Sequence, residues 1–237
     1  MGDGKVAIVT GAGSGVGRCV ARMLVESGYR VALVGRTEAT LRETGAGLGS
    51  GLGAESAAWI AVVADVTSDD DRARIVEETT SAFGRIDAVV NNAGKAGLVK
   101  VQDATVADIR DQFEVNAIGP IDLAARCIRA MGKEGGAVVF TSSMSTKDPF
   151  PGLGIYGCAK SALNAACRAI ENDGSGVRAY AIAPGAIETG MLRSMWDETV
   201  LPSDKTLAPE TVARAIVDCV TGETDAEAGA TVFMASG

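Results

Sequence analysis

The chain has 237 residues, 47% hydrophobic and 22% charged, a composition that supports one large α/β domain or two small ones. Its net charge of −8 argues against the broad basic surface that nucleic-acid backbones require. No apolar run approaches the roughly 18–20 residues that cross a bilayer, and the N-terminal apolar stretch is too short for a signal peptide. We therefore expect a cytoplasmic protein with neither a nucleic-acid nor a membrane partner.

The chain contains no histidine and five scattered cysteines. Without histidine there are no histidine general bases, no Ser-His triads and none of the usual zinc sites, so we expect no metal centre. Acid–base chemistry must then come from Tyr, Lys, Cys, Asp or Glu. The cysteines form no CxxC pair and are interpreted as small packing side chains, Cys158 included.

The first predicted strand, Lys5–Thr10, leads into the glycine-rich loop TGAGSGVG and then into a predicted helix, Val16–Ser27. The loop does not match GxGxxG, but it matches TGxxxGxG. Glycines at these positions let the backbone approach a pyrophosphate, while the helix directs free N–H groups at the anion. The alternative is a strand–helix turn that holds no ligand. The predicted cofactor-binding residues of the loop are Gly11, Ser14, Gly15, Val16 and Gly17.

The second predicted strand, Arg30–Val34, is followed by Gly35 and Arg36, where an NAD site usually has an acidic residue for the ribose 2′-hydroxyl. A guanidinium at this place can pair with a 2′-phosphate instead. The sequence therefore favours NADP(H) over NAD(H), with Arg36 as the discriminating cation; the alternative is a solvated surface arginine. A predicted helix, Glu38–Leu48, and a glycine-rich loop, Gly45–Gly53, come next.

The next two predicted strands, Trp59–Ala64 and Ile86–Val90, carry polar residues at their carboxyl ends, where ligands bind in doubly wound sheets. We expect Asp65 at the adenine, or alternatively as a helix cap. The sequence NNAG after the fourth strand permits close approach to the nucleotide, although a plain turn would also explain it. Between these strands Ser68 and Asp71 predict a capping box for the helix Asp69–Phe83. The cofactor-binding residues predicted here are Asp65, Val66, Asn92, Ala93 and Gly94.

The long predicted helix Ala107–Met131 contains a polar residue, Asn116, where an apolar residue would suit a core helix. Asn116 is therefore a candidate functional residue, with a kink near Gly119–Pro120 as the alternative.

The fifth predicted strand, Ala137–Thr141, is followed by two serines, and the next predicted helix, Tyr156–Glu171, opens with YxxxK. The i, i+4 spacing places the Tyr156 phenol and the Lys160 ammonium on one helix face. A nearby ammonium stabilises phenolate and lowers the pKa of tyrosine from about 10 toward the working range. Ser143, thirteen residues upstream, can donate to a substrate carbonyl oxygen while Tyr156 protonates it. Without that context, a surface Tyr–Lys pair would be the simpler interpretation.

The remaining predicted elements are the strand Val177–Ile182, the helix Glu210–Val220 with Pro209 in its first turn, and the strand Thr231–Met234. Seven strands alternating with six helices predict a single doubly wound, Rossmann-type α/β domain over residues 1–237, with a parallel sheet covered by helices on both faces. Two groups of apolar residues lie near the predicted site. Met144, Phe150 and Leu153 are candidate pocket walls, and Met191, Leu192, Met195 and Trp196 form either an apolar flap or ordinary packing.

In this order and spacing, TGxxxGxG, DV, NNAG, the Asn of VNAIG, Ser143, YxxxK and PGAIET resemble the short-chain dehydrogenase/reductase family from Val6 to about Met234. The resemblance implies a catalytic tetrad of Asn116, Ser143, Tyr156 and Lys160. In it Tyr156 is the general acid/base, Lys160 lowers its pKa and holds the nicotinamide ribose, Ser143 polarises the carbonyl, and Asn116 supports a water that leads protons to Lys160. The resemblance also places Pro184, Gly185, Ile187 and Thr189 at the nicotinamide amide and the pyrophosphate.

The expected activity is hydride transfer between NADP(H) and the carbonyl or secondary alcohol carbon of a small or acyl substrate, with 3-oxoacyl reduction as one plausible class. The expected assembly is a homo-oligomer, a dimer or a homotetramer, because Ala107–Met131 and Tyr156–Glu171 carry more apolar side chains than one sheet face would bury. The main alternative is a regulatory NADP(H) sensor on the same fold that does no chemistry.

Overall fold

The computed structural model describes residues 4–48 and 58–236, which contain one parallel seven-stranded sheet with the strand order β3-β2-β1-β4-β5-β6-β7. The order reverses direction between β1 and β4, as in a doubly wound fold, so the predicted fold class is confirmed. The strands are β1 (Val6–Thr10), β2 (Arg30–Gly35), β3 (Trp59–Val63), β4 (Ala88–Asn91), β5 (Gly136–Thr141), β6 (Val177–Pro184) and β7 (Thr231–Met234).

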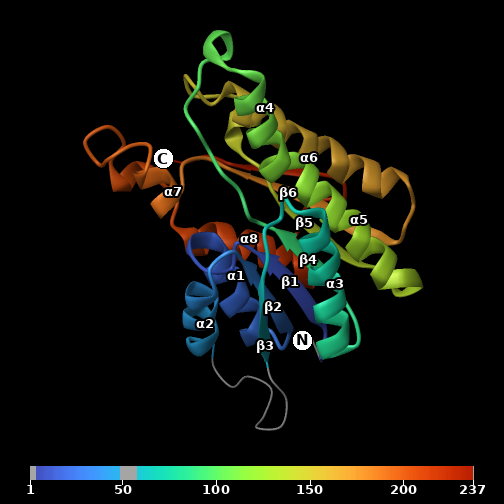
Figure 1. The fold of residues 1–237 in the computed structure, drawn as a ribbon. Helices are drawn as coiled ribbons and strands as arrows, with labels where there is room; N and C mark the ends of the chain where they lie inside the picture. The colour runs from blue at the N-terminus through green and yellow to red at the C-terminus, as the bar shows by residue number, and fades with distance from the viewer. Residues whose placement is uncertain (1–3, 49–57, 237) are drawn as a thin grey trace.

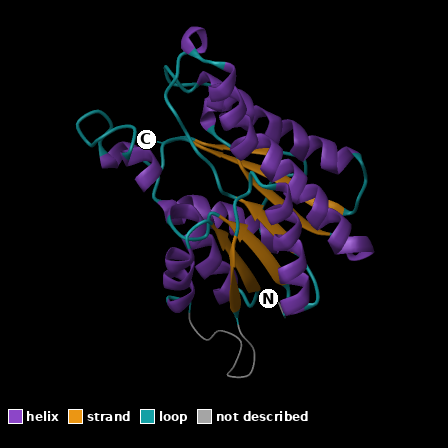
Figure 2. Ribbon diagram, viewed as in Figure 1, coloured by secondary structure: helices purple, strands orange, loops and turns teal. Residues whose placement is uncertain are grey.

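Helices cover both faces of this sheet (Figures 1 and 2). One face carries α1 (Gly15–Glu26), α2 (Glu38–Ala46) and α8 (Pro209–Thr221); the other carries α3 (Asp69–Phe83), α4 (Val106–Phe113), α5 (Gly119–Met131) and α6 (Gly154–Asn172). The short helix α7 (Gly190–Arg193) and the loop after it project from the body beside the C-terminus (Figure 1). Among the described helices, none combines the length and the apolar composition needed to cross a membrane.

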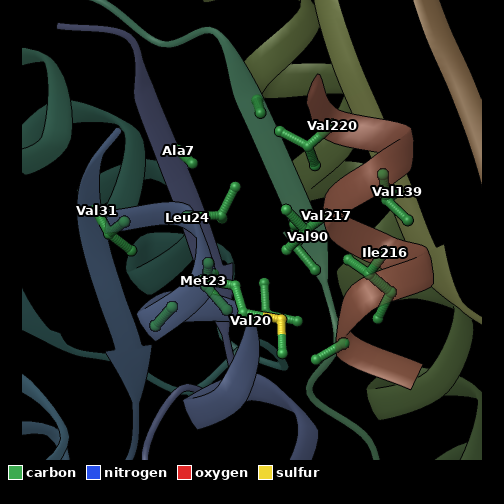
Figure 3. Close-up of a cluster of buried hydrophobic side chains, with 14 of the residues drawn as sticks. Ala7, Val20, Met23, Leu24, Val31, Val90, Val139, Ile216, Val217 and Val220 are labelled. Carbon is green, nitrogen blue, oxygen red and sulfur yellow. The ribbon is translucent and has the colours of Figure 1, made fainter. Parts of the chain in front are cut away.

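Two hydrophobic clusters, one on each face of the sheet, form the core. Because side chains alternate along a strand, Ala7 and Val9 of β1 pack with α1 and α8, while Ile8 between them packs with α3, α5 and α6. Figure 3 shows the first cluster, in which Val20 and Leu24 of α1 and Ile216 and Val217 of α8 lie on the same face of the sheet. Burial on both faces explains why the central strands are continuously apolar.

The predicted single helix Ala107–Met131 is wrong in one respect, because a π-helical turn, Glu114–Ile118, separates α4 from α5. The Gly119 N–H donates to the Glu114 carbonyl five residues back. Pro120 has no N–H to donate to the carbonyl of Asn116, so the regular i−4 pattern cannot continue there. Asn116 lies in the middle of this π-helical turn.

The predicted capping box at α3 is only half formed. The Ser68 hydroxyl accepts from the Asp71 N–H at 3.3 Å, but the Asp71 carboxylate accepts from the Asp65 N–H at 2.7 Å instead of from Ser68. The reciprocal pair occurs at α4, between Thr105 and Asp108. Helix α2 ends at Ala46, so the predicted loop Gly45–Gly53 begins inside a helix, and its residues from 49 onward lie outside the described residues.

Candidate active site

A cavity of about 890 Å³ opens at the carboxyl ends of the strands and brings together segments distant in sequence. Its walls come from the glycine loop, the segments after β4, β5 and β6, the start of α6, and α7 with the loop after it. Most predicted site residues line it. Those that do not, within the described part of the chain, are Gly17, Arg36, Asp65, Val66 and Asn116.

The glycine loop approaches the cavity with its backbone. Gly11 and Gly15 have positive φ values of 67° and 49°, a conformation that side chains with a Cβ rarely adopt. Ser14 precedes α1 without capping it by a side-chain hydrogen bond, so the first N–H groups of this helix face the loop. Gly17 also meets a packing requirement. A Cβ there would lie 2.2 Å from the Gly11 carbonyl oxygen, so this glycine permits close packing of helix on loop.

The predicted adenosine end lies outside the cavity. The Asp65 Oδ1 accepts from the Thr67 N–H at 2.9 Å and from the Thr67 hydroxyl at 2.8 Å, so this oxygen holds a local turn, and the residue that caps α3 is Ser68. The Val66 carbonyl is held by the buried Arg72 at 2.9 Å. Arg36 is exposed at the end of β2. The structure therefore separates these residues from the enclosed part of the site.

Thr10, which the sequence analysis placed in the motif but not in the site, organises the turn after β4. Its hydroxyl accepts from the N–H groups of Asn92 and Ala93, both at 3.0 Å, and its carbonyl accepts from the Asn92 side chain at 3.0 Å. Thr10 thus joins the glycine loop to NNAG. Its place as the first residue of TGxxxGxG was the available signal.

Lys160 and Tyr156 lie together on the first turns of α6, as their spacing predicts. Lys160 is 2% exposed, and its ammonium lies 5.7 Å from the centre of the Tyr156 ring and donates to the Thr141 carbonyl at 2.7 Å. Burial lowers the pKa of Lys160 to about 7. Ser143, at the end of β5, lines the same cavity, and its hydroxyl accepts from the Ser145 N–H at 3.1 Å.

The Tyr156 pKa differs from the expected direction. Burial raises it to about 12, and a hydrogen bond with Ser143 lowers it by less than burial raises it. The physical reason is that burial removes water from the phenol, which disfavours the charged phenolate. In this structure Tyr156 is therefore a protonated phenol at neutral pH.

Asn116 lies behind the cavity wall and holds the chain that leaves NNAG. Its Oδ1 accepts from the Lys95 N–H at 3.2 Å, and its amide donates to the Lys95 carbonyl at 2.8 Å and the Gln112 carbonyl at 3.0 Å. A Cβ on Gly94 would lie 3.1 Å from Asn116 Oδ1 and 3.4 Å from Lys160 Nζ. Glycine at 94 therefore allows Asn116 and Lys160 to approach the same point of the chain.

The outer walls of the cavity are apolar. Met144, Phe150 and Leu153 line it as predicted. Met191, Leu192, Met195 and Trp196 line it as well, and Leu192 among them is also buried. The rings of Phe150 and Trp196 meet with centroids 5.6 Å apart. Cys158, interpreted as packing, is exposed instead, because it lies on the outer face of α6, away from Tyr156 and Lys160.

Comparison with known proteins gives consistent matches over most of the chain. Residues 5–199 match the family of short chain dehydrogenases. Versicolorin reductase 1 of Aspergillus parasiticus is 33% identical over 213 residues, covering 89% of this chain and 79% of that protein.

Two solved structures extend the match to the fold. A 3-ketoacyl-(acyl-carrier-protein) reductase from Brucella melitensis, complexed with NADH, has a TM-score of 0.87 and 26% identity, and the match covers 100% of this chain and 99% of that chain. An alcohol dehydrogenase from Thermococcus sibiricus, complexed with 5-hydroxy-NADP, has a TM-score of 0.85 and 26% identity over 98% of this chain and 96% of that one. By the family match, the relatives and the fold, the chain belongs to the short-chain dehydrogenase family of oxidoreductases.

Proposed function

We propose that the chain is an NADP(H)-dependent oxidoreductase, a single catalytic domain that transfers hydride between nicotinamide and a carbonyl or secondary alcohol carbon. The observation that carries the proposal is a buried lysine beside a tyrosine in an apolar cavity. Burying an ammonium costs free energy, and a protein that only bound a nucleotide would gain nothing from placing it next to a phenol.

The residues around the glycine loop fit a nicotinamide dinucleotide. Backbone at Gly11 and Gly15, uncapped N–H groups at the start of α1, and the facing segment Pro184–Thr189 form a cradle in which added side chains would collide. Such N–H groups bind pyrophosphate. The related structures contain NADH or an NADP derivative, so both cofactors occur among the relatives.

The preference for NADP(H) is supported by Arg36 at the end of β2, where no carboxylate would repel a 2′-phosphate. Its exposed guanidinium is available to a ligand that extends from the cavity along the sheet edge. We expect Asp65 to accept from the adenine amino group through Oδ2, because its Oδ1 already accepts from Thr67.

In the proposed reduction, the bound cofactor supplies the hydride, and the protein supplies the proton and the orientation. Tyr156 donates its phenolic proton to the substrate oxygen as negative charge develops there, and Ser143 stabilises the same oxygen through a hydrogen bond. Lys160 stabilises the phenolate that forms and holds the ribose. Asn116 positions the Gly94–Lys95 segment against Lys160 and supports a water that relays protons to it.

The substitution Tyr156→Phe tests the proposal, because it keeps the ring and its packing but removes the proton donor. NADPH-dependent reduction of a panel of ketones, aldehydes and 3-oxoacyl thioesters should fall by about 10²–10⁴-fold, with NADPH affinity nearly unchanged. Carbonyl turnover that persists within about tenfold would refute the role of Tyr156. The alternative, a silent sensor, requires that no member of the panel is reduced by the unaltered protein.

We also propose that the chain forms a homo-oligomer, a dimer or a tetramer. Val106 and Ile109 of α4 and Ile118 of the π turn are 63%, 36% and 46% exposed, although each is apolar. Exposed apolar side chains gathered on one helical segment favour a protein partner. A second copy of the chain would cover them without requiring a different protein.

A further inference from the structure

The segment that contains α7 and leads to α8 leaves the body and returns to the same place. It departs after Glu188, whose N–H donates to the Leu207 carbonyl at 2.9 Å, and it returns at Leu207, whose N–H donates to the Ala186 carbonyl at 2.8 Å. The residues between these ends supply the apolar flap of the cavity, including Met195, Trp196 and Leu201. This segment, residues 189–206, is called the excursion below. The contacts that hold its interior in place therefore determine the shape of the outer cavity.

Arg193 joins several points of that interior, in addition to the local hydrogen bonds of Asp197 and Ser203. Its Nε and one Nη2 hydrogen donate to the two oxygens of Glu188, the first at 2.6 Å. Its Nη1 donates to the carbonyls of Trp196 at 3.4 Å and Leu201 at 2.8 Å, and its Nη2 also donates to the Ser203 hydroxyl at 3.1 Å. A guanidinium has five N–H donors, and five acceptors surround this one, so each donor has an acceptor.

The carboxylate partner has a second neighbour besides the guanidinium. The Thr206 hydroxyl, which donates to the Ser203 carbonyl at 2.7 Å, also lies 3.2 Å from Glu188 Oε2. The hydrogen bonds from Arg193 lower the pKa of Glu188 to about 2. The carboxylate therefore remains ionised at any pH at which the protein would be assayed.

We infer that Arg193, anchored on Glu188, is a positioning residue that fixes the flap 194–203 over the cavity and so sets the affinity for the carbonyl substrate; this rests on the proposed function. Arg193 binds the carbonyl of Trp196, whose ring contacts Phe150 on the opposite wall, and the carbonyl of Leu201, whose side chain lines the cavity. The substrate wall is thus fixed through backbone atoms.

Two substitutions of Arg193 distinguish the geometry of the guanidinium from its positive charge. Lysine keeps the positive charge but has three donors on a single nitrogen, so it cannot bridge a carboxylate and two carbonyls in the same plane. We therefore expect Arg193→Lys to fail nearly as badly as Arg193→Gln. Arg22→Gln removes the same charge from an exposed pair with Glu26 on α1 and is the matched control.

The first measurement requires no substrate. The chain has two tryptophans, and Trp59 packs against the core, so a Trp59→Phe background leaves Trp196 as the reporter of the flap. In that background Arg193→Gln and Arg193→Lys should increase acrylamide quenching of Trp196 at least about twofold, with Arg22→Gln unchanged. If Trp59→Phe disturbs folding, Trp196→Phe in the two-tryptophan protein isolates the same signal by subtraction.

The second measurement is steady-state reduction of the best substrate in the carbonyl panel. Both Arg193 variants should raise KM for the carbonyl at least about tenfold, while kcat stays within about threefold and the affinity for NADPH is unchanged. Unchanged quenching together with unchanged KM would overturn the inference, as would full function in Arg193→Lys. If the unaltered protein reduces nothing, the proposed function fails, and the quenching experiment still decides whether Arg193 holds the flap.

Discussion

Replacing the buried Lys160 by methionine should stabilise the fold while abolishing turnover. The pKa of Lys160 falls from 10.5 to about 7 on burial, so the folded protein holds this proton less tightly than the unfolded chain does. Stability therefore rises with pH between about 7 and about 10.5, where the unfolded chain binds more protons, and the penalty is fully present below the folded pKa. Methionine has similar length and carries no charge to desolvate.

The size of this stabilisation follows from the pKa shift of Lys160. At about 1.36 kcal/mol per pKa unit, charging the buried lysine costs about 5 kcal/mol at low pH and about 4 kcal/mol at pH 7. The substitution also removes the hydrogen bond to the Thr141 carbonyl, which offsets about 1–2 kcal/mol. The expected net gain in the free energy of unfolding is about 2–3 kcal/mol at neutral pH.

Urea unfolding of the unaltered protein and of Lys160→Met, at about pH 6.5 and about pH 9, measures this gain. The advantage of the methionine variant should shrink by about 2.5 kcal/mol between the two pH values, because the native lysine discharges over this range. Lys100→Met, at an exposed position, is the control and should change little at either pH. A destabilised Lys160→Met protein, or an advantage independent of pH, would refute the reasoning from burial.

Two further predictions concern the cofactor and the assembly. Arg36→Ala should weaken NADPH binding by about ten- to a hundredfold and NADH binding much less, because a charge-assisted contact to the 2′-phosphate is lost. Calorimetry measures both affinities, and equal binding of the two cofactors by the unaltered protein would contradict this role of Arg36. Ile109→Asp should dissociate the oligomer by placing a charge among Val106 and Ile118, and sedimentation would then show the 24.1 kDa monomer. An unaltered protein that already sediments as a monomer would rule out the proposed interface.

Local sequence was sufficient to predict the sheet and most of the cavity. Continuously apolar strands are recognisable because a sheet buried on both faces leaves no polar positions, and the order of strands and helices restricts the topology. Tyr156 and Lys160 meet because four residues make about one helical turn, and Ser143 joins them because β5 ends beside α6. These relationships depend on backbone geometry between residues close in the chain or at equivalent strand ends.

Other features depended on contacts that no local pattern encodes. The pKa of Lys160 is set by the residues that exclude water around it, and the function of Gly17 is set by the Gly11 carbonyl against which it packs. Arg193 looks like an ordinary surface arginine in the sequence, yet folding the excursion back on Glu188 surrounds it with five acceptors. Spacing predicts which side chains share a face, but desolvation and the pairing of every donor are decided only when distant segments pack together.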